Sequence, residues 1–231
     1  MNTFLRTAAW LSLLLPPIAH AAPAAKAATT DDFQRISFHA PSTPGFRTAS
    51  MLSIGFTGAI VTLSSNHGAL NLNDVTFTFN HGWLEVLPHR EGRVTLHMKR
   101  QPRADERVGI LTLYNSRAGN RQSYRFEVAT WLMGDGQRDS NVTQARERCA
   151  RLGGRLLTAR ELRDVSRSWF GLSQGNLRTM YPNAALFNAQ ARTGGSFWVQ
   201  EGKALHLHTG IKSVERGIDT LCRYEYENVT V

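Results

Sequence analysis

The feature that most limits how this chain can fold is the alternation of apolar and polar residues from Arg35 to Leu132. Within Val75–Phe79 and Val94–Met98, every second residue is apolar, so the apolar side chains share one face of an extended strand. Turn-forming residues separate such runs about every 8 to 12 positions. This pattern is typical of an antiparallel β-sandwich, which we expect in the first half of the chain.

The spacing becomes helical beyond Gly134. One helix is expected to begin at Asn141 or Thr143 and to end at the glycine pair 153–154. Its apolar face, with spacing i, i+4 and i+7, holds Ala145, Cys149 and Leu152.

A second helix follows, because Thr158 and Glu161 have the spacing of a capping box. An irregular segment after Phe170 leads to short apolar runs that predict strands. The second half is therefore expected to be α+β, with the boundary near Gly134. The apolar face of the second helix holds Leu162, Val165 and Trp169.

The N-terminus has the pattern of a secretory signal. Arg6 gives a positive start, Ala8–Ile18 is apolar, and small residues precede a cleavage point after Ala21. We expect residues 1–21 to be removed and residues 22–32 to form a flexible arm; the alternative is an uncleaved anchor. No other apolar run approaches the roughly 18 residues that span a bilayer, so no integral membrane segment is expected after cleavage.

The chain has two cysteines, Cys149 and Cys222. Export would place them in an oxidising compartment, where thiols pair. We therefore expect a disulfide between them, the alternative being two buried free thiols.

The charge balance argues against a nucleic-acid partner. Lys and Arg number 27 against 18 Asp and Glu, a formal net charge of +9, while 42% of residues are hydrophobic. The basic residues are dispersed and form no long run of the kind seen in nucleic-acid-binding tails. This composition predicts a folded core and a weak attraction to acidic surfaces at low salt.

Residues Gly171–Gly175 match the G-x-S-x-G motif of hydrolases, with Ser173 at the nucleophile position. That motif requires a preceding strand and an acid before the histidine. Here a helix precedes it, and His206 and His208 come before Asp219. A surface loop is the preferred interpretation, and a hydrolase using Ser173 is the lowest-ranked alternative.

Two patterns resemble metal sites. His206 and His208 share one face of a predicted strand, but no third zinc ligand is apparent. Asp135, Asp139 and Asn141 suggest a calcium loop but lack its glycine and terminal glutamate. We therefore expect no metal and no cofactor.

Arg216–Asp219 reads R-G-I-D, which resembles the integrin-type R-G-D tripeptide with one residue inserted. The insertion changes the reach between the guanidinium and the carboxylate. A tight turn before the last strand is the preferred interpretation.

The second half resembles the compact C-type-lectin-like domain at the tip of the intimin and invasin family of bacterial adhesins. The resemblance rests on Thr143–Val165 (TQARERCARLGGRLLTARELRDV), on Phe197–Val199 (FWV) and on Asp219–Glu225 (DTLCRYE). Upstream, Gly55–Ser65 and Ser123–Leu132 resemble the bacterial immunoglobulin-like domain that precedes this tip.

The resemblance implies a fold, a disulfide and a binding role. In this family a cysteine of the first helix bonds one in the last strands, which corresponds to Cys149 and Cys222. Leu157 departs from the family pattern, which prefers proline there. Calcium-dependent glycan binding is not implied, because the Glu-Pro-Asn, Gln-Pro-Asp and Trp-Asn-Asp triplets of calcium-dependent lectins are missing from the sequence.

The sequence thus predicts an all-β immunoglobulin-like sandwich at 33–133 followed by an α+β C-type-lectin-like domain at 134–231. The expected function is that of an exported, non-enzymatic adhesin for a protein or glycan receptor, found secreted, at the cell surface or in the periplasm. The alternative is a periplasmic or envelope assembly component.

The binding surface is expected in the irregular stretch Gly171–Gly195, because loops carry function. Its candidate residues are Asn176, Arg178, Tyr181, Asn183, Phe187 and Arg192.

Overall fold

The fold is mostly β-sheet with a few short helices, as a computed structural model shows. The structure describes residues 33, 36–41, 53–65, 71–87, 93–170, 177–187, 195–207, 209–212 and 218–226. Within these ranges, no helix is long and apolar enough to cross a membrane.

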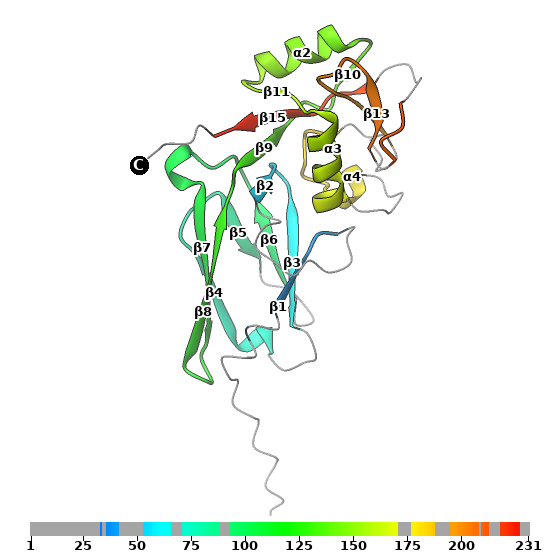
Figure 1. The fold of residues 1–231 in the computed structure, drawn as a ribbon. Coiled ribbons are helices and arrows are strands. Elements are labelled where there is room, and N and C mark those ends of the chain that lie inside the picture. The colour runs from blue at the N-terminus through cyan, green and yellow to red at the C-terminus, as the bar shows by residue number, and fades with distance from the viewer. Residues whose placement is uncertain are drawn as a thin grey trace, which may run out of the picture.

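Two antiparallel sheets make up most of the first half (Figure 1). Phe38 of the first sheet and Phe126 of the second are in edge contact, with ring centroids 5.7 Å apart. The first sheet holds, in order, β1 (Ile36–His39), β3 (Ile60–Ser65), β6 (Val94–Met98) and β5 (Leu84–Leu87). The second holds β4 (Val75–Phe79), β7 (Val108–Asn115) and β8 (Asn120–Glu127).

The alternating pattern produces these strands. Val94, Leu96 and Met98 of β6 are all buried, as their shared face predicts. On β7, Ile110 and Tyr114 lie on the opposite face and are exposed. Each strand of this kind therefore turns one face to the core between the sheets.

One predicted strand is divided in two. In the sequence, Tyr124–Leu132 (YRFEVATWL) has apolar residues throughout and no turn-forming residue, which predicts one strand. In the structure, β8 ends at Glu127, and β9 (Thr130–Met133) belongs to another sheet. The backbone N–H groups of Val128 and Ala129 donate to carbonyl oxygens of Arg107 and Ser53, each at 2.9 Å. These bonds redirect the chain between the two sheets.

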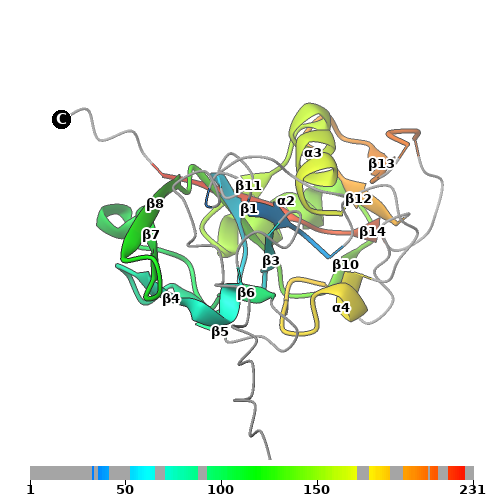
Figure 2. The same cartoon turned by 90° about the horizontal axis from the view of Figure 1, so that it is seen from below.

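The second half combines helices with a sheet of short strands. Seen from below, α4 and β13 lie on the opposite side of the molecule from β7 and β8 (Figure 2). The helices are α2 (Val142–Arg151), α3 (Ala159–Val165), which continues as a π-turn over Ser166–Phe170, and α4 (Leu177–Met180). The sheet holds, in order, β10 (Arg138–Asp139), β14 (Ile218–Asp219), β12 (Ser196–Trp198) and β13 (Ala204–His206).

Helix α2 begins and ends where its capping residues predict. The side chain of Asn141 accepts a hydrogen bond at 3.0 Å from a backbone N–H of the first turn. Gly153, just beyond the helix, has a φ of +80°, which favours glycine. Ala145 and Cys149 are fully buried, but Leu152 is 36% exposed. Leu152 is therefore not part of the buried face, because it follows the last helical residue.

Helix α3 begins at the predicted capping box. The backbone N–H of Glu161 donates to Thr158 Oγ1 at 3.2 Å, and the backbone N–H of Thr158 donates to Glu161 Oε2 at 2.8 Å. Its predicted apolar face is confirmed, since Leu162, Val165 and Trp169 are buried.

A further sheet joins the two halves. It holds, in order, β11 (Arg155–Leu156), β15 (Cys222–Glu225), β9 and β2 (Ile54–Gly55). Strand β15 of the second half pairs antiparallel with β9 of the first, from Cys222 opposite Met133 to Glu225 opposite Thr130. One hydrophobic core extends through both halves. The division at residue 133 stays a prediction, but the strands on either side of it hydrogen-bond to each other.

Candidate functional site

The described residues around α4, 177–187, are called the α4 segment, and their exposed side chains the α4 surface. The α4 segment carries four of the residues predicted for the binding surface. Arg178 and Asn183 are exposed there. Arg178 Nη1 donates to the backbone oxygen of Phe187 at 3.0 Å, which holds the guanidinium against its own loop. Asn176 and Arg192 lie outside the described residues. Arg178 and Asn183 are therefore the predicted surface residues that the structure both describes and exposes.

The two aromatic candidates lie in the core. Tyr181 is fully buried and Phe187 is 1% exposed. Phe56, from the first half, packs edge-on against both rings, with centroid distances of 5.1 Å to Tyr181 and 5.9 Å to Phe187. The expectation that these two side chains are exposed is therefore corrected, because a residue distant in sequence covers them.

Further contacts fix the α4 segment to the first half. Trp169 Nε1 donates to the backbone oxygen of Ile54 at 2.8 Å, and the Tyr181 hydroxyl donates to the backbone oxygen of Trp169 at 2.5 Å. Gly58 has a φ of +87°, and a Cβ there would lie 2.5 Å from the backbone of Asn183. Contacts with the sandwich therefore hold the α4 segment in place.

A charged network lies where α3 meets the shared sheet. Arg155 Nη2 lies 2.8 Å from Glu161 Oε1 and 3.3 Å from Glu225 Oε1, and Arg223 bonds to both carboxylates. Burial alone would raise the pKa of Glu161, but hydrogen bonds from Arg155 and the Thr158 backbone, with the charge of Arg223, lower it to about 2. The Glu161 carboxylate is therefore ionised at neutral pH.

Two pockets flank this network. One of about 440 Å³ is lined by Arg155, Glu225 and Tyr226, and one of about 220 Å³ by Glu161 and Asp164, while Arg223 borders both. The four charged groups of the network neutralise one another across α3, β11 and β15. The network therefore joins elements and offers little net charge to a ligand.

The disulfide between Cys149 and Cys222 is present. Both residues are fully buried, and their Cα atoms are 5.3 Å apart. Ala145 and Leu156 pack around the bond. It ties α2 to β15, the strand at which the two halves meet.

The acidic residues weighed as a calcium loop already have partners. Arg148 bonds to Asp135 Oδ2 at 2.6 Å and to Asp139 Oδ2 at 2.9 Å, and the Thr220 hydroxyl donates to Asp139. Burial alone would raise the pKa of Asp139, but the Arg148 and Thr220 bonds hold it below its usual value. Asn141 caps α2. In the described part of the chain, no three His, Cys, Asp or Glu side chains are grouped to hold a metal ion.

The carboxylate of the R-G-I-D segment is buried. Asp219 is 5% exposed and accepts a hydrogen bond from Arg138 Nε at 3.0 Å. Arg216 and Gly217 lie outside the described residues. Asp219 is therefore not displayed at the surface as an integrin-type tripeptide requires.

Of the residues considered for a hydrolase or a zinc site, the structure describes His206 and Asp219. Ser173 and His208 are not among the described residues. His206 is half-buried on β13, directly opposite Ser196 of β12. His206 Nδ1 and Ser196 Oγ are both buried, and neither has a hydrogen-bond partner among the described residues.

A serine–histidine contact lies in the sandwich instead. His39 Nε2 is 2.8 Å from Ser37 Oγ and 3.0 Å from Ser64 Oγ. Catalytic triads need an acidic group on the other imidazole nitrogen. In the ranges that the structure covers, His39 has no carboxylate partner. The contact links β1 to β3 across their register.

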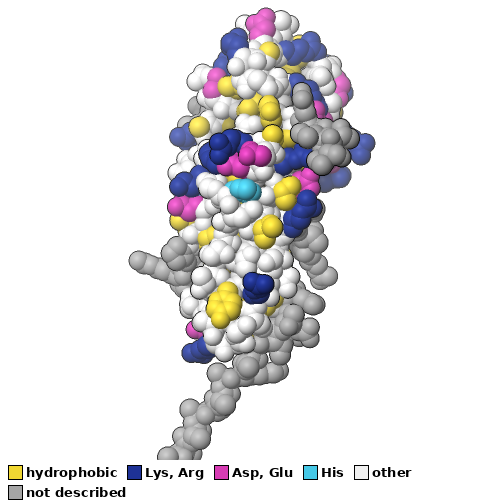
Figure 3. Space-filling view, turned by 90° about the vertical axis from the view of Figure 1, so that its left-hand side faces the viewer, with side chains coloured by type: hydrophobic (Ala, Val, Ile, Leu, Met, Phe, Trp, Pro, Cys, Tyr) yellow, Lys and Arg dark blue, Asp and Glu magenta, His cyan; other side chains and the backbone are white. Residues whose placement is uncertain are grey.

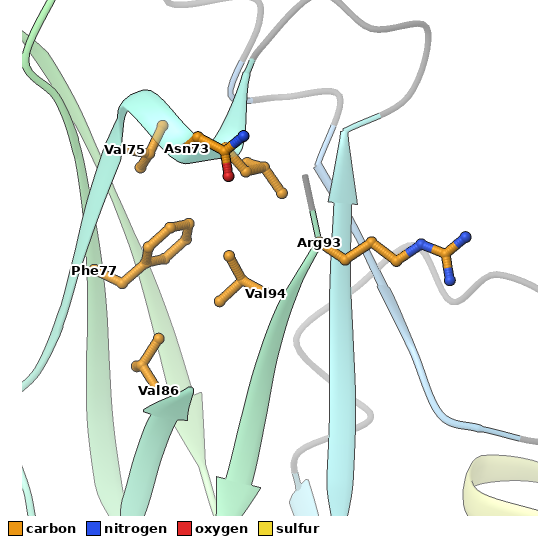
Figure 4. Close-up of a pocket in the computed structure, with 7 residues that line it drawn as sticks. Asn73, Val75, Phe77, Val86, Arg93 and Val94 are labelled. Carbon is orange, nitrogen blue, oxygen red and sulfur yellow. The ribbon is translucent and has the colours of Figure 1, made fainter. Parts of the chain in front are cut away.

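The sandwich also contains an apolar pocket of about 340 Å³ at its end. Phe77, Val86 and Val94 point into this space from β4, β5 and β6, whereas Arg93 points away from it (Figure 4). Asn73 is the other polar residue of the lining. The pocket thus belongs to the gap between the two sheets and not to the α4 surface.

Comparison with known proteins gives a likeness in fold. No protein-family model matches the chain, and no curated protein matches it. A solved structure does match, the crystal structure of invasin, described as a bacterial integrin-binding protein. The TM-score is 0.57 at 15% sequence identity, over 82% of this chain. The chain spans 38% of the length of that structure. This likeness shows that the chain has an invasin-like fold.

Proposed function

We propose that this chain is an exported, non-enzymatic binding protein of the invasin and intimin type. In this proposal an immunoglobulin-like sandwich, residues 33–133, supports a C-type-lectin-like unit, residues 134–231, that contacts a receptor. The fold likeness to invasin, a bacterial integrin-binding protein, carries the proposal. The order of elements supports it, with sandwich strands first, then two capped helices, then the disulfide to a late strand.

The bracing of the α4 segment supports a binding role. A surface that is held in place before contact loses less conformational entropy when it binds. Phe56 and the Trp169 side chain hold this segment on the sandwich. Arg178 and Asn183 are exposed on it, and they replace the buried aromatic residues as the first side chains to test.

The receptor class in this proposal is a protein or a glycan. Because Asp219 is buried and bonded to Arg138, the proposal does not use the R-G-I-D segment as an integrin-type ligand. Receptor contact is assigned to exposed groups of the second half.

The test measures binding of fluorescently labelled protein to cultured host cells by flow cytometry. Wild type should bind saturably, and Arg178→Ala with Asn183→Ala should weaken binding at least about tenfold if the α4 surface carries a hot spot. Lys203→Ala, exposed on the second half, is the matched control and should bind as wild type does. Linear binding without saturation on every cell type would overturn the adhesin proposal.

The alternative is an interaction component of the bacterial envelope. Its test is cell fractionation together with binding to envelope extracts. Protein confined to the periplasm, with saturable binding to envelope extract and none to host cells, would favour this alternative over adhesion.

A further inference from the structure

Helix α3 and its π-turn present three arginines on one face. Arg160, Arg163 and Arg167 are all exposed. Their spacing of three and four residues places them in one stripe along the helix surface. At 1.5 Å per residue, the stripe is roughly 10 Å long. The opposite face, with Leu162 and Val165, is buried in the core and fixes the stripe in place.

These three guanidiniums have no partner in the described part of the chain. Among the described residues, none forms an ion pair or a side-chain hydrogen bond with Arg160, Arg163 or Arg167. The neighbouring carboxylate of Glu161 is already bound by the network on the other side of α3. Asp164 is the exposed carboxylate within α3. Three arginines beside one exposed carboxylate leave the stripe with a net positive charge, and none of the three guanidiniums forms an ion pair within the described residues.

Other exposed charges are arranged differently. On the face that carries β7 and β8, basic and acidic side chains are interspersed (Figure 3). There, Arg107 and Arg125 both lie near Glu127, at 3.8 Å and 3.5 Å. Arg117 lies 3.5 Å from Asp74. The pattern on α3, three adjacent arginines without a partner, is distinct from this mixed surface.

We propose that the α3 stripe, formed by Arg160, Arg163 and Arg167, docks a linear sulfated polysaccharide. The planar guanidinium of arginine matches the oxygen pairs of sulfate and carboxylate groups. A stripe of three guanidiniums along one helix face suits a chain that carries anionic groups at intervals of several ångström. This inference rests on the proposed function and names the chemistry of one partner.

The surroundings of the stripe favour a glycan over a lipid surface. Helices that lie on membranes place apolar side chains on the same exposed side as their basic residues or beside it. The large hydrophobic side chains of α3 are buried. The exposed large hydrophobic side chains of the described ranges all lie outside α3; they are Leu87, Ile110, Tyr114, Leu152 and Ile211. A polar polyanion needs no such apolar contact.

The test uses heparin as the sulfated polysaccharide, with purified exported protein and isothermal titration calorimetry. The variant Arg160→Gln, Arg163→Gln, Arg167→Gln should bind heparin roughly tenfold or more weakly than wild type, because it loses three charge contacts. It should also show a shallower dependence of affinity on salt. The melting temperature of the variant should match that of wild type, since all three side chains are exposed.

The chain offers a matched control. Arg93, Arg121 and Arg151 are also exposed and have no ion pair within the described ranges, but they lie on three different elements or turns. Replacing these three by Gln removes the same charge and should leave heparin affinity within about twofold of wild type. Equal losses in both triple variants would show that only net charge attracts heparin, and would overturn the proposal.

Two further probes complete the design. Desulfated heparin should bind much more weakly than heparin, and vesicles of phosphatidylglycerol should not bind through the stripe. Equal binding to desulfated heparin, or a loss of vesicle binding in the α3 variant that exceeds its loss of heparin binding, would also overturn the proposal. A failed heparin titration would refute the proposal that the α3 stripe binds a sulfated polysaccharide. Saturable cell binding that persists after heparinase treatment would, in that case, still support the adhesin function.

Discussion

The Tyr181 side chain packs in the aromatic core and also gives its buried hydroxyl a hydrogen-bond partner. Its ring contacts Phe56 and Phe170, with centroids 5.1 Å and 6.1 Å away, and its hydroxyl donates to the Trp169 backbone at 2.5 Å. A buried hydroxyl without a partner is costly, so this hydrogen bond permits a tyrosine in an apolar cluster. Tyr181 therefore holds the α4 segment from inside the core.

Replacing Tyr181 should affect stability and not receptor contact. Tyr181→Phe is expected to lower the free energy of unfolding by about 1 kcal/mol, the net value of a typical hydrogen bond. Tyr181→Ala should lower it by about 3–5 kcal/mol, because it leaves a cavity. Urea unfolding measures both changes. Lys203→Ala is the exposed control and should stay within about 0.5 kcal/mol of wild type; a stable Tyr181→Ala protein would contradict the assignment of this ring to the core.

Local signals at single residues were readable in the sequence, and distant contacts were not. The capping box of Thr158 and Glu161 depends on residues three positions apart, and the structure contains it. The burial of Tyr181 and Phe187 depends on Phe56, which lies more than a hundred residues away in the chain. No periodicity within the α4 segment reports that contact, so an exposed role was predicted for the two rings.

At the scale of elements, Glu161 is the group that links α3 to the shared sheet. Its carboxylate binds Arg155 of β11 and Arg223 of β15 and also closes the capping box. The carboxylate is largely buried, so these bonds are less screened by water than surface ion pairs are. Three elements therefore depend on one ionised side chain.

This arrangement predicts a pH dependence. The pKa of Glu161 is about 2 in the folded protein against an ordinary value of 4.5, so ionisation stabilises the fold. That contribution is fully present above about pH 4.5 and is lost as the pH falls towards 2. In chemical denaturation, Glu161→Gln should flatten the fall in stability over this range. Glu147→Gln, an exposed α2 variant without an ion pair in the described ranges, should follow the wild-type curve; identical curves for all three proteins would refute the link.

The strands were predictable as strands, but their assignment to sheets was not. Alternation identified β4 and β6 correctly, because side-chain period alone reveals a half-buried strand. It merged the end of β8 with β9 into one strand, because apolar residues recur from Tyr124 to Leu132 with no Gly, Pro, Asn or Asp between them. The turn between them is set by hydrogen bonds from Val128 and Ala129 to distant segments, which no local pattern encodes.

At the scale of the whole molecule, the two halves share both a sheet and a core. Strands β2 and β9 of the first half extend the sheet of β11 and β15. The aromatic cluster around Phe56 adds contacts from Trp169, Phe170 and Tyr181. Domains joined by a flexible linker bury much less at their boundary.

The shared sheet predicts one cooperative unfolding transition. Differential scanning calorimetry should give a single peak, with equal calorimetric and van't Hoff enthalpies. Phe56→Ala should lower the melting temperature of the whole protein, and no separate peak should appear for either half. Two independently shifting peaks in wild type would show that the halves unfold separately, contrary to this prediction.

The position of β15 also determines when the molecule can be completed. Among the described strands it is the last in sequence, yet it lies inside the shared sheet between β11 and β9. A ribosome or translocon that delivers the chain from its N-terminus releases residues 222–225 long after the sandwich strands. Non-local pairings of this kind form slowly. Until β15 pairs, the shared sheet is incomplete, one edge of β9 is unpaired, and Cys149 has no partner thiol.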